Sequence, residues 1–169
     1  MKRIGILSDT HGTVARQVYS FFADCDELWH AGDIGPHVLE KLQEFKPVVS
    51  VFGNTDCWDL RQIIPETQLF QREGMTILMT HIGGYPGHYS PRGKTLIATH
   101  RPGLFVSGHS HILKAMPDRV NNLLHLNPGA AGYHGWQQFT TAMRFSIRNG
   151  TPEDLEIYQI GRNEAAAYR

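Results

Sequence analysis

The stretch Arg3-Ile4-Gly5-Ile6-Leu7-Ser8-Asp9-Thr10-His11-Gly12 contains the pattern that decides the fold. Its first six residues form a short apolar run typical of a buried strand, and the polar group that follows stops the strand. The same succession of a buried strand and a polar cluster recurs further along the chain. The later clusters are Gly32-Asp33, Gly53-Asn54-Thr55-Asp56, His81 and Gly108-His109-Ser110-His111.

Helical spacing of apolar residues separates the first strands. It predicts helices over residues 14–23 and 38–45, between strands at 3–8, 27–31 and 48–52. This alternation indicates α/β organisation with early parallel strands. In such sheets the functional groups gather on loops beyond the carboxyl ends of the strands.

The chain after Pro65 is richer in strands. Residues 68–72 and 75–80 are expected to form a hairpin, 95–101 a short helix and 104–107 a buried strand, with further strands beyond. The polar, alanine-rich residues 163–169 are expected to be a frayed tail. The length of 169 residues predicts one domain over 1–169.

Composition narrows the class of protein. Sixteen basic and sixteen acidic residues give a formal net charge of +0, so strong nucleic-acid binding is not expected. No apolar run approaches the roughly 20 residues of a membrane span, and no signal peptide is visible. The two cysteines are too few for a disulfide framework or a thiolate metal site. We therefore expect a cytoplasmic protein that does not act at a membrane.

The polar clusters supply metal-binding chemistry. Apart from Asp56, they together offer two carboxylates, an amide oxygen and four of the ten histidines. Because side chains alternate along an extended chain, Asp9 and His11 can point to one side, as can His109 and His111. Each cluster alone could be a turn or a helix cap, but five at strand ends favour a metal site. Mixed oxygen and nitrogen ligands suit Mn, Fe, Zn or Ni, and this number of ligands fits two ions that share one carboxylate.

The ordered set Asp-x-His, Gly-Asp, Gly-Asn-x-Asp, His and Gly-His-x-His resembles the calcineurin-like metallophosphoesterase superfamily. The short chain and the form Gly53-Asn54-Thr55-Asp56 are similar to its branch of small YfcE-type bacterial and archaeal phosphodiesterases. The resemblance runs from about Lys2 to Gly129 and includes Asn127-Pro128-Gly129. It implies an α/β (α+β) fold: a four-layer αββα sandwich with two mixed β-sheets.

The resemblance also implies a site with two divalent ions, Mn²⁺ foremost, with Ni²⁺, Fe²⁺ and Zn²⁺ as alternatives. One ion would be held by Asp9, His11, Asp33 and His111. The other would be held by Asp33, Asn54, His81 and His109, so that Asp33 bridges the pair. The residues expected to take part directly in catalysis are Asp33, Asn54, Asp56 and His109.

The implied activity is metal-dependent hydrolysis of a small phosphoester. The expected substrates are phosphodiesters, with phosphomonoesters as a second class, and the expected nucleophile is a hydroxide that bridges the ions. The alternative is a non-catalytic scaffold, because the same fold serves as a protein-interaction subunit in eukaryotic membrane-trafficking assemblies. Loss of a ligand imidazole would favour the scaffold, and here all the expected ligands are present. The sequence leaves the oligomeric state open, homo-oligomers included.

Several residues near the clusters are candidates for supporting roles. Many relatives carry a histidine where this chain has Thr55, which indicates that no dedicated side chain protonates the leaving group. His30 is expected to support the ligands from behind. The loop 82–93 leaves directly from His81, and its Tyr85, Tyr89 and Arg92 are expected to contact the non-reacting part of a substrate.

Overall fold

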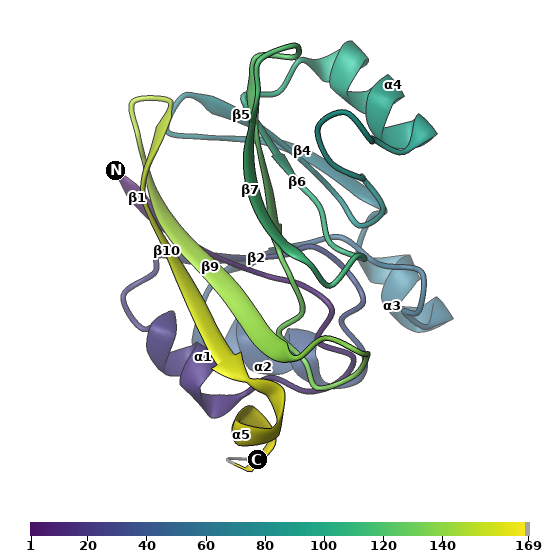
Figure 1. Cartoon of the computed structure of the whole chain (residues 1–169), viewed down its shortest axis with the longest axis vertical. Coiled ribbons are helices and arrows are strands. Elements are labelled where there is room, and N and C mark those ends of the chain that lie inside the picture. The colour runs from purple at the N-terminus through teal and green to yellow at the C-terminus, as the bar shows by residue number, and fades with distance from the viewer. Residues whose placement is uncertain (168–169) are drawn as a thin grey trace.

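The computed structural model describes residues 1–167, in which two five-stranded sheets pack face to face (Figure 1). The first sheet, sheet A, has the order β10-β9-β1-β2-β3. Its parallel strands are β1 (Lys2–Leu7), β2 (Glu27–His30) and β3 (Val48–Ser50). The antiparallel strands β9 (Phe139–Arg148) and β10 (Thr151–Gly161) complete it.

The second sheet, sheet B, has the order β4-β5-β6-β8-β7. Its parallel centre consists of β5 (Met75–Thr80), β6 (Leu104–Val106) and β8 (Leu123–Pro128). The edge strands β4 (Thr67–Arg72) and β7 (Leu113–Asp118) run antiparallel to their neighbours. Both sheets are therefore mixed, as the resemblance implied.

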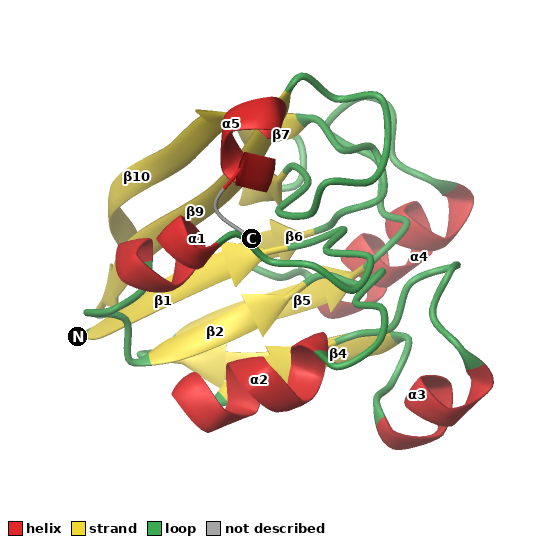
Figure 2. Cartoon of the chain, turned by 90° about the horizontal axis from the view of Figure 1, so that it is seen from below, coloured by secondary structure: helices red, strands yellow, loops and turns green. Residues whose placement is uncertain are grey.

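Helices form the two outer layers (Figure 2). Sheet A is covered by α1 (Arg16–Phe21), α2 (Val38–Phe45) and α5 (Arg162–Ala167). Sheet B is covered by α4 (Pro91–His100). The short helix α3 (Trp58–Ile63) contributes no buried residue. The observed α+β fold is thus the four-layer αββα sandwich expected from the sequence. None of the helices within residues 1–167 has the length and apolar character needed to span a membrane.

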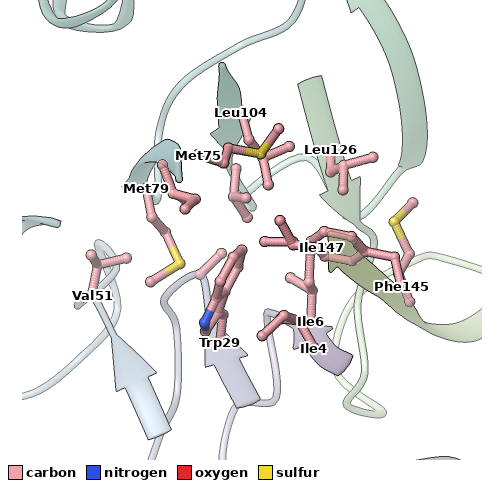
Figure 3. Close-up of a cluster of buried hydrophobic side chains, with 14 residues drawn as sticks. Ile4, Ile6, Trp29, Val51, Met75, Met79, Leu104, Leu126, Phe145 and Ile147 are labelled. Atoms are coloured by element: carbon pink, nitrogen blue, oxygen red, sulfur yellow. The ribbon is translucent and has the colours of Figure 1, made fainter. Parts of the chain in front are cut away.

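Strand alternation builds the core. In β1, Ile4 and Ile6 face sheet B, whereas Leu7 faces the helices of sheet A. Trp29 of β2 lies between the sheets among methionine, leucine and isoleucine side chains (Figure 3). Gly5 is required on the helix side, because a Cβ there would lie 2.7 Å from atoms of Leu28 and Phe22. The pleat therefore assigns each strand residue to one of two apolar layers.

Three local expectations differ from the structure. Helix α4 begins at Pro91 rather than at residue 95, because the Ser90 hydroxyl accepts a hydrogen bond from the Gly93 N–H and proline suits the first turn. Helix α3 was not expected. Residues 163–167 of the expected frayed tail belong to α5, where Ala165 is buried and its carbonyl accepts a hydrogen bond from the Tyr133 hydroxyl at 3.0 Å. The rest of the expected tail, residues 168–169, lies outside the described residues.

Burial of His125 on β8 makes stability depend on pH. Its ring contacts Phe105 and Tyr89, and its Nε2 lies 3.0 Å from the Ser107 hydroxyl. Burial, together with the charge of Lys114, lowers the pKa of His125 to about 4. Between pH 6.5 and pH 4 the unfolded chain therefore binds more protons at this position than the folded chain does, and stability falls as the pH falls through this range.

We expect His125→Asn to flatten this dependence. The slope of unfolding free energy against pH should decrease by up to about 1.4 kcal/mol per pH unit, the contribution of one proton. Urea titrations of chelator-treated protein between pH 4.5 and 7.5 measure the slope. His100→Asn, at the exposed end of α4, is the matched control and should leave it unchanged. An unaltered slope in His125→Asn would show that His125 does not take up the proton.

Candidate metal centre

The loops that follow β1, β2, β5 and β6 are joined by backbone hydrogen bonds at one edge of the sandwich. The Asp9 N–H donates to the Gly32 carbonyl at 3.0 Å, and the His11 N–H donates to the Asp33 carbonyl at 3.0 Å. Within sheet B, the Gly108 N–H donates to the His81 carbonyl at 3.0 Å. Across the two sheets, the Gly132 N–H, in the segment after β8, donates to the Asp9 carbonyl at 3.2 Å. Side chains from both sheets are therefore held at the same place.

Two buried carboxylates lie among the imidazoles. Asp33 Oδ2 is 3.3 Å from His81 Nε2 and 3.9 Å from His11 Nε2. Asp9 Oδ1 is 3.2 Å from His111 Nε2 and 3.9 Å from His81 Nε2. Each carboxylate thus lies near one histidine predicted for each ion.

These ligand atoms form two overlapping groups. Asp9, His11 and His111 make one group, and Asp9, Asp33 and His81 make the other, with all ligand atoms of a group within 4.8 Å of one another. The groups share Asp9, whereas the resemblance found in the sequence implies Asp33 as the bridge. The position of Asp33 Oδ2 near both His11 and His81 is compatible with that bridging role.

Asn54 and His109 lie on the side of His81. Asn54 Oδ1 is 3.1 Å from His81 Nε2, and the His109 ring centroid is 5.3 Å from that of His81. The His109 N–H also donates to Asp9 Oδ2 at 3.1 Å. All seven predicted ligands are therefore gathered at one place, and His109 is the most exposed of those from sheet B.

Hydrogen bonds behind the site orient two imidazoles. His81 Nδ1 lies 2.7 Å from the Ala31 carbonyl oxygen, which can only accept, so Nδ1 carries a proton and Nε2 faces Asp33. His111 Nδ1 lies 3.0 Å from Gln137 Oε1, and the Gln137 amide nitrogen donates to the His134 carbonyl. Such contacts behind a ligand fix the ring nitrogen that is presented to a metal.

Burial and the charged groups of the site shift the pKa values of its carboxylates and imidazoles. Burial alone would raise the pKa of Asp33, but the hydrogen bond and charge of His81 and the Thr55 N–H outweigh it and hold that pKa well below its ordinary value. Burial opposes protonation of His81, yet Asp33 and Asp9 raise its pKa. The Asp9 carboxylate, whose Oδ1 lies 3.2 Å from His111 Nε2, raises the pKa of His111, whereas burial lowers the pKa of His11.

The donor set fits divalent cations. Asp9 Oδ1 is buried and makes no hydrogen bond within the described residues, although an isolated buried carboxylate oxygen is costly. The Nε2 atoms of His11 and His111 approach to 3.5 Å, which suits two lone pairs directed at one cation. Oxygen and imidazole donors in this number match transition-metal chemistry.

Backbone conformation marks the same residues. Asp9, His11, Asp33, His109 and His111 all have φ between 44° and 68°, the left-handed region that non-glycine residues rarely occupy. Such conformations cost free energy and are common at functional sites. The polypeptide therefore accepts local strain at five of the seven predicted ligands.

Two glycines allow the carboxylate and imidazole to pack closely. A Cβ on Gly53 would lie 2.1 Å from Asp33 Oδ1, and one on Gly32 would lie 2.6 Å from His81 Nδ1. Gly32 also has a φ of +96°. Any side chain at either position would displace a predicted ligand.

Asp56, expected to be catalytic, holds two loops together. Its Oδ1 accepts hydrogen bonds from the Ile34 N–H at 2.8 Å and the Gly35 N–H at 2.9 Å, and its Oδ2 accepts one from the Gly53 N–H at 2.8 Å. Both oxygens of this buried carboxylate are thus engaged by backbone. This geometry gives Asp56 a positioning role behind Asp33 and Asn54.

His30 also lies behind the ligands. It is fully buried, its Nε2 is 2.9 Å from the Thr10 hydroxyl, and its Nδ1 accepts a hydrogen bond from the Gly32 N–H at 3.2 Å. The Thr10 hydroxyl in turn donates to the Ile34 carbonyl at 2.7 Å. Burial lowers the pKa of His30 to about 3, so the ring is neutral.

The three loop residues expected to contact substrate lie in different surroundings. Tyr89 is buried and its hydroxyl donates to Asp118 at 2.8 Å, so it stabilises the sheet B layer rather than facing the site. Tyr85 lies under the ammonium group of Lys114, 4.4 Å from the ring centroid. Arg92 lines a cavity of about 200 Å³ beside Asn54 and His81, where it forms an ion pair with Glu66 at 3.0 Å.

Two supporting residues were not predicted from the sequence. Gln137 orients His111 from an irregular segment between β8 and β9, which carries no recognisable motif. Arg61 on α3 donates to the carbonyl oxygens of Asp56 at 2.8 Å, Asn54 at 2.6 Å and Gly53 at 3.2 Å. An arginine one helical turn after a Gly-Asn-x-Asp loop is the only sequence signal that could have indicated it.

Solved structures with the same fold include phosphoesterases and Vps29 proteins. An archaeal phosphodiesterase is 20% identical with a TM-score of 0.71, over 94% of this chain and 99% of that one. A predicted phosphoesterase from Streptococcus pneumoniae is 20% identical with a TM-score of 0.65, over 96% and 90%. Vps29 from Entamoeba histolytica, solved with zinc, is 14% identical with a TM-score of 0.72, over 95% and 99%.

No curated protein sequence matched the chain significantly. A family model does match, and it covers residues 1–150, from β1 to the end of the β9–β10 turn. The matched region contains every predicted metal ligand. The chain belongs to the calcineurin-like phosphoesterase superfamily.

Proposed function

We propose that this protein is a phosphodiesterase with a two-ion centre, and that it also accepts phosphomonoesters. The observation that carries the proposal is the buried Asp9 Oδ1, which makes no hydrogen bond within the described residues and lies 3.2 Å from His111 Nε2 among converging imidazoles. Because the chain belongs to the calcineurin-like phosphoesterase superfamily, we infer that this donor set serves the hydrolysis of phosphoesters. The archaeal phosphodiesterase with the same fold supports phosphodiesters as the substrate class.

The proposed ligands follow the family pattern. Asp9, His11, Asp33 and His111 hold one ion, and Asp33, Asn54, His81 and His109 hold the other. When bound, the two ions would activate a water nucleophile at neutral pH and neutralise charge on the phosphoryl oxygens. We propose Mn²⁺, and the zinc in the Entamoeba Vps29 structure makes Zn²⁺ the first alternative to compare.

The chain's own groups position these ligands and the substrate. The Thr55 N–H donates to Asp33 Oδ1 at 2.8 Å, and the Thr55 hydroxyl lies 3.4 Å from His11 Nδ1. A threonine hydroxyl is a poor acid, so we propose that acidic leaving groups depart fastest. His109, exposed at the rim, is the imidazole best placed to contact a phosphoryl oxygen.

The alternative is a protein-interaction scaffold without catalytic activity. The likeness to Vps29 structures leaves this alternative open. The two functions differ in a direct measurement. A phosphodiesterase loses hydrolysis of bis(4-nitrophenyl) phosphate after metal removal and regains it with Mn²⁺. A scaffold hydrolyses nothing in either state, even when metal analysis shows two ions per chain.

Asp33→Ala tests the two-ion centre. Because Asp33 lies near ligands of both ions, its loss should reduce kcat by on the order of 100-fold or more and lower the metal content below two ions per chain. Steady-state kinetics and elemental analysis measure both effects. Asp59→Ala, which removes an exposed carboxylate on α3, is the control and should behave as wild type. Wild-type turnover and metal content in Asp33→Ala would refute the proposed ligand set.

Arg61→Ala tests the support behind Asn54. Loss of the three guanidinium contacts should loosen residues 53–56 and weaken Mn²⁺ affinity by roughly 10-fold or more. Calorimetric titration of metal-stripped protein measures the affinity without reference to catalysis. The exposed neighbour Gln62→Ala should bind Mn²⁺ as wild type does. If the two variants bind Mn²⁺ equally well, Arg61 does not position the loop.

Arg92→Ala tests the cavity beside Asn54 and His81. If the non-reacting arm of a diester enters this cavity, the substitution should raise KM severalfold for a diester with a large polar arm and leave KM for an aryl phosphate nearly unchanged. Lys94→Ala, an exposed cation further along α4, is the matched control. An equal change in KM for both substrates would show that the non-reacting arm of the diester does not bind in this cavity.

A further inference from the structure

A larger cavity lies behind the metal centre, on the helical side of sheet A. It has a volume of about 680 Å³, and none of the predicted metal ligands lines it. Its walls come from the segment after His11, from α1, from α2 and from the segment after β8, with Gly12, Arg16, Tyr19, Lys41 and Tyr133 among its residues. Helices α1 and α2 both lie on this face of sheet A, with strands β1 and β2 visible between them (Figure 2). Cavities that bind small molecules usually measure about 300–1,000 Å³.

Two cations border this cavity without a partner of opposite charge. Arg16 opens α1 and Lys41 lies on α2, and both are exposed. Within residues 1–167 neither side chain forms an ion pair, although Arg3, Arg72, Arg92, Arg144 and Arg148 all do. Carboxylates are available on α2 itself, at Glu40 and Glu44, but they do not approach Lys41 to ion-pair distance. The cavity therefore carries local positive charge on a chain whose formal net charge is +0.

The other residues that line the cavity favour a ligand with a flat, apolar ring system. Tyr19 packs edge-on against Phe45, with ring centroids 5.4 Å apart, which fixes the orientation of its ring at the wall. The Tyr133 hydroxyl is held by the Ala165 carbonyl, so its ring also has a fixed place. Val14 and Val38 add aliphatic surface, and Gly12 also lines the cavity. Aromatic and aliphatic walls with a few convergent polar groups are the usual composition of a small-molecule site.

We propose that this cavity binds an organic anion with an aromatic body, whose charged group pairs with Arg16 and Lys41 and whose ring lies among the side chains of Tyr19, Val38 and Tyr133. The site is separate from the metal centre and requires no metal. It adjoins that centre through the backbone, because Gly12 follows His11 directly and its N–H donates to the Ile34 carbonyl at 2.8 Å. The proposal goes beyond the phosphodiesterase activity and does not depend on it.

Binding can be measured on chelator-treated protein, in which the metal centre takes no part. The probe is 1-naphthyl phosphate, which combines an aromatic ring with a phosphate group. Naphthalene-1-methanol lacks the charge, and inorganic phosphate lacks the ring. We expect saturable binding of the probe at one site per chain, with an affinity at least tenfold higher than that of either fragment, because both halves of the cavity are then engaged. Amide resonances of Gly12 and Thr13 should shift during the titration.

Three variants locate the site. Arg16→Ala/Lys41→Ala should weaken binding of 1-naphthyl phosphate at least tenfold and leave naphthalene-1-methanol unaffected. Ser20→Trp, which adds a large ring at an exposed lining residue, should block both compounds. Lys94→Ala, an exposed cation on α4, should change nothing.

Several results would overturn the proposal. They are the absence of saturable binding, equal affinity for the charged and neutral compounds, or unchanged binding in Arg16→Ala/Lys41→Ala. A failure of the phosphodiesterase proposal would instead leave the metal-loaded protein inactive while naphthyl phosphate binding to the metal-free protein persists. The two outcomes are therefore distinguishable.

Discussion

The burial of Asp9 and Asp33 side by side is the constraint on which the rest of the site depends. Two carboxylates in an environment of low dielectric repel each other and lose hydration, so the fold must supply positive charge to compensate for both. His81 and His111 are the nearest groups that can carry this charge, and the two carboxylates raise the pKa of both imidazoles. Divalent ions at the same position would compensate the carboxylates more completely and would compete with protons for the imidazoles.

The surrounding loops are built to keep this arrangement in place. Asp56 receives three backbone N–H groups from two loops, and Arg61 donates to three carbonyl oxygens of one of them. His30 links the loops after β1 and β2 through Thr10 and Gly32. These contacts stabilise left-handed backbone conformations that would otherwise be unfavourable at Asp9, His11 and Asp33. Local strain is therefore offset by hydrogen bonds one layer behind the ligands.

Most of the fold and the convergence of the ligands could be predicted from the sequence. Short apolar strands followed by Gly, Asp, Asn or His identify both the elements and the edge where they meet, because the carboxyl ends of parallel strands lie together. The place of Tyr89 could not be predicted, since its packing depends on Asp118, 29 residues away. Gln137 lies in an irregular segment without periodicity. Helix α5 is alanine-rich but has only six residues, too few to be stable by helix propensity alone, so it depends on the tertiary contacts of Ala165.

Because the predicted ligands are divided between the two sheets, the apolar core also influences the geometry of the metal centre. Sheet A carries Asp9, His11, Asp33 and Asn54, whereas sheet B carries His81, His109 and His111. Sheets that pack face to face lie about 10 Å apart, at a distance set by the side chains between them. Trp29, Met79 and Leu126 in that layer therefore act as a spacer that sets the distance between the two halves of the metal centre. A substitution that changes the volume of these core side chains should therefore also change the spacing of the metal ligands.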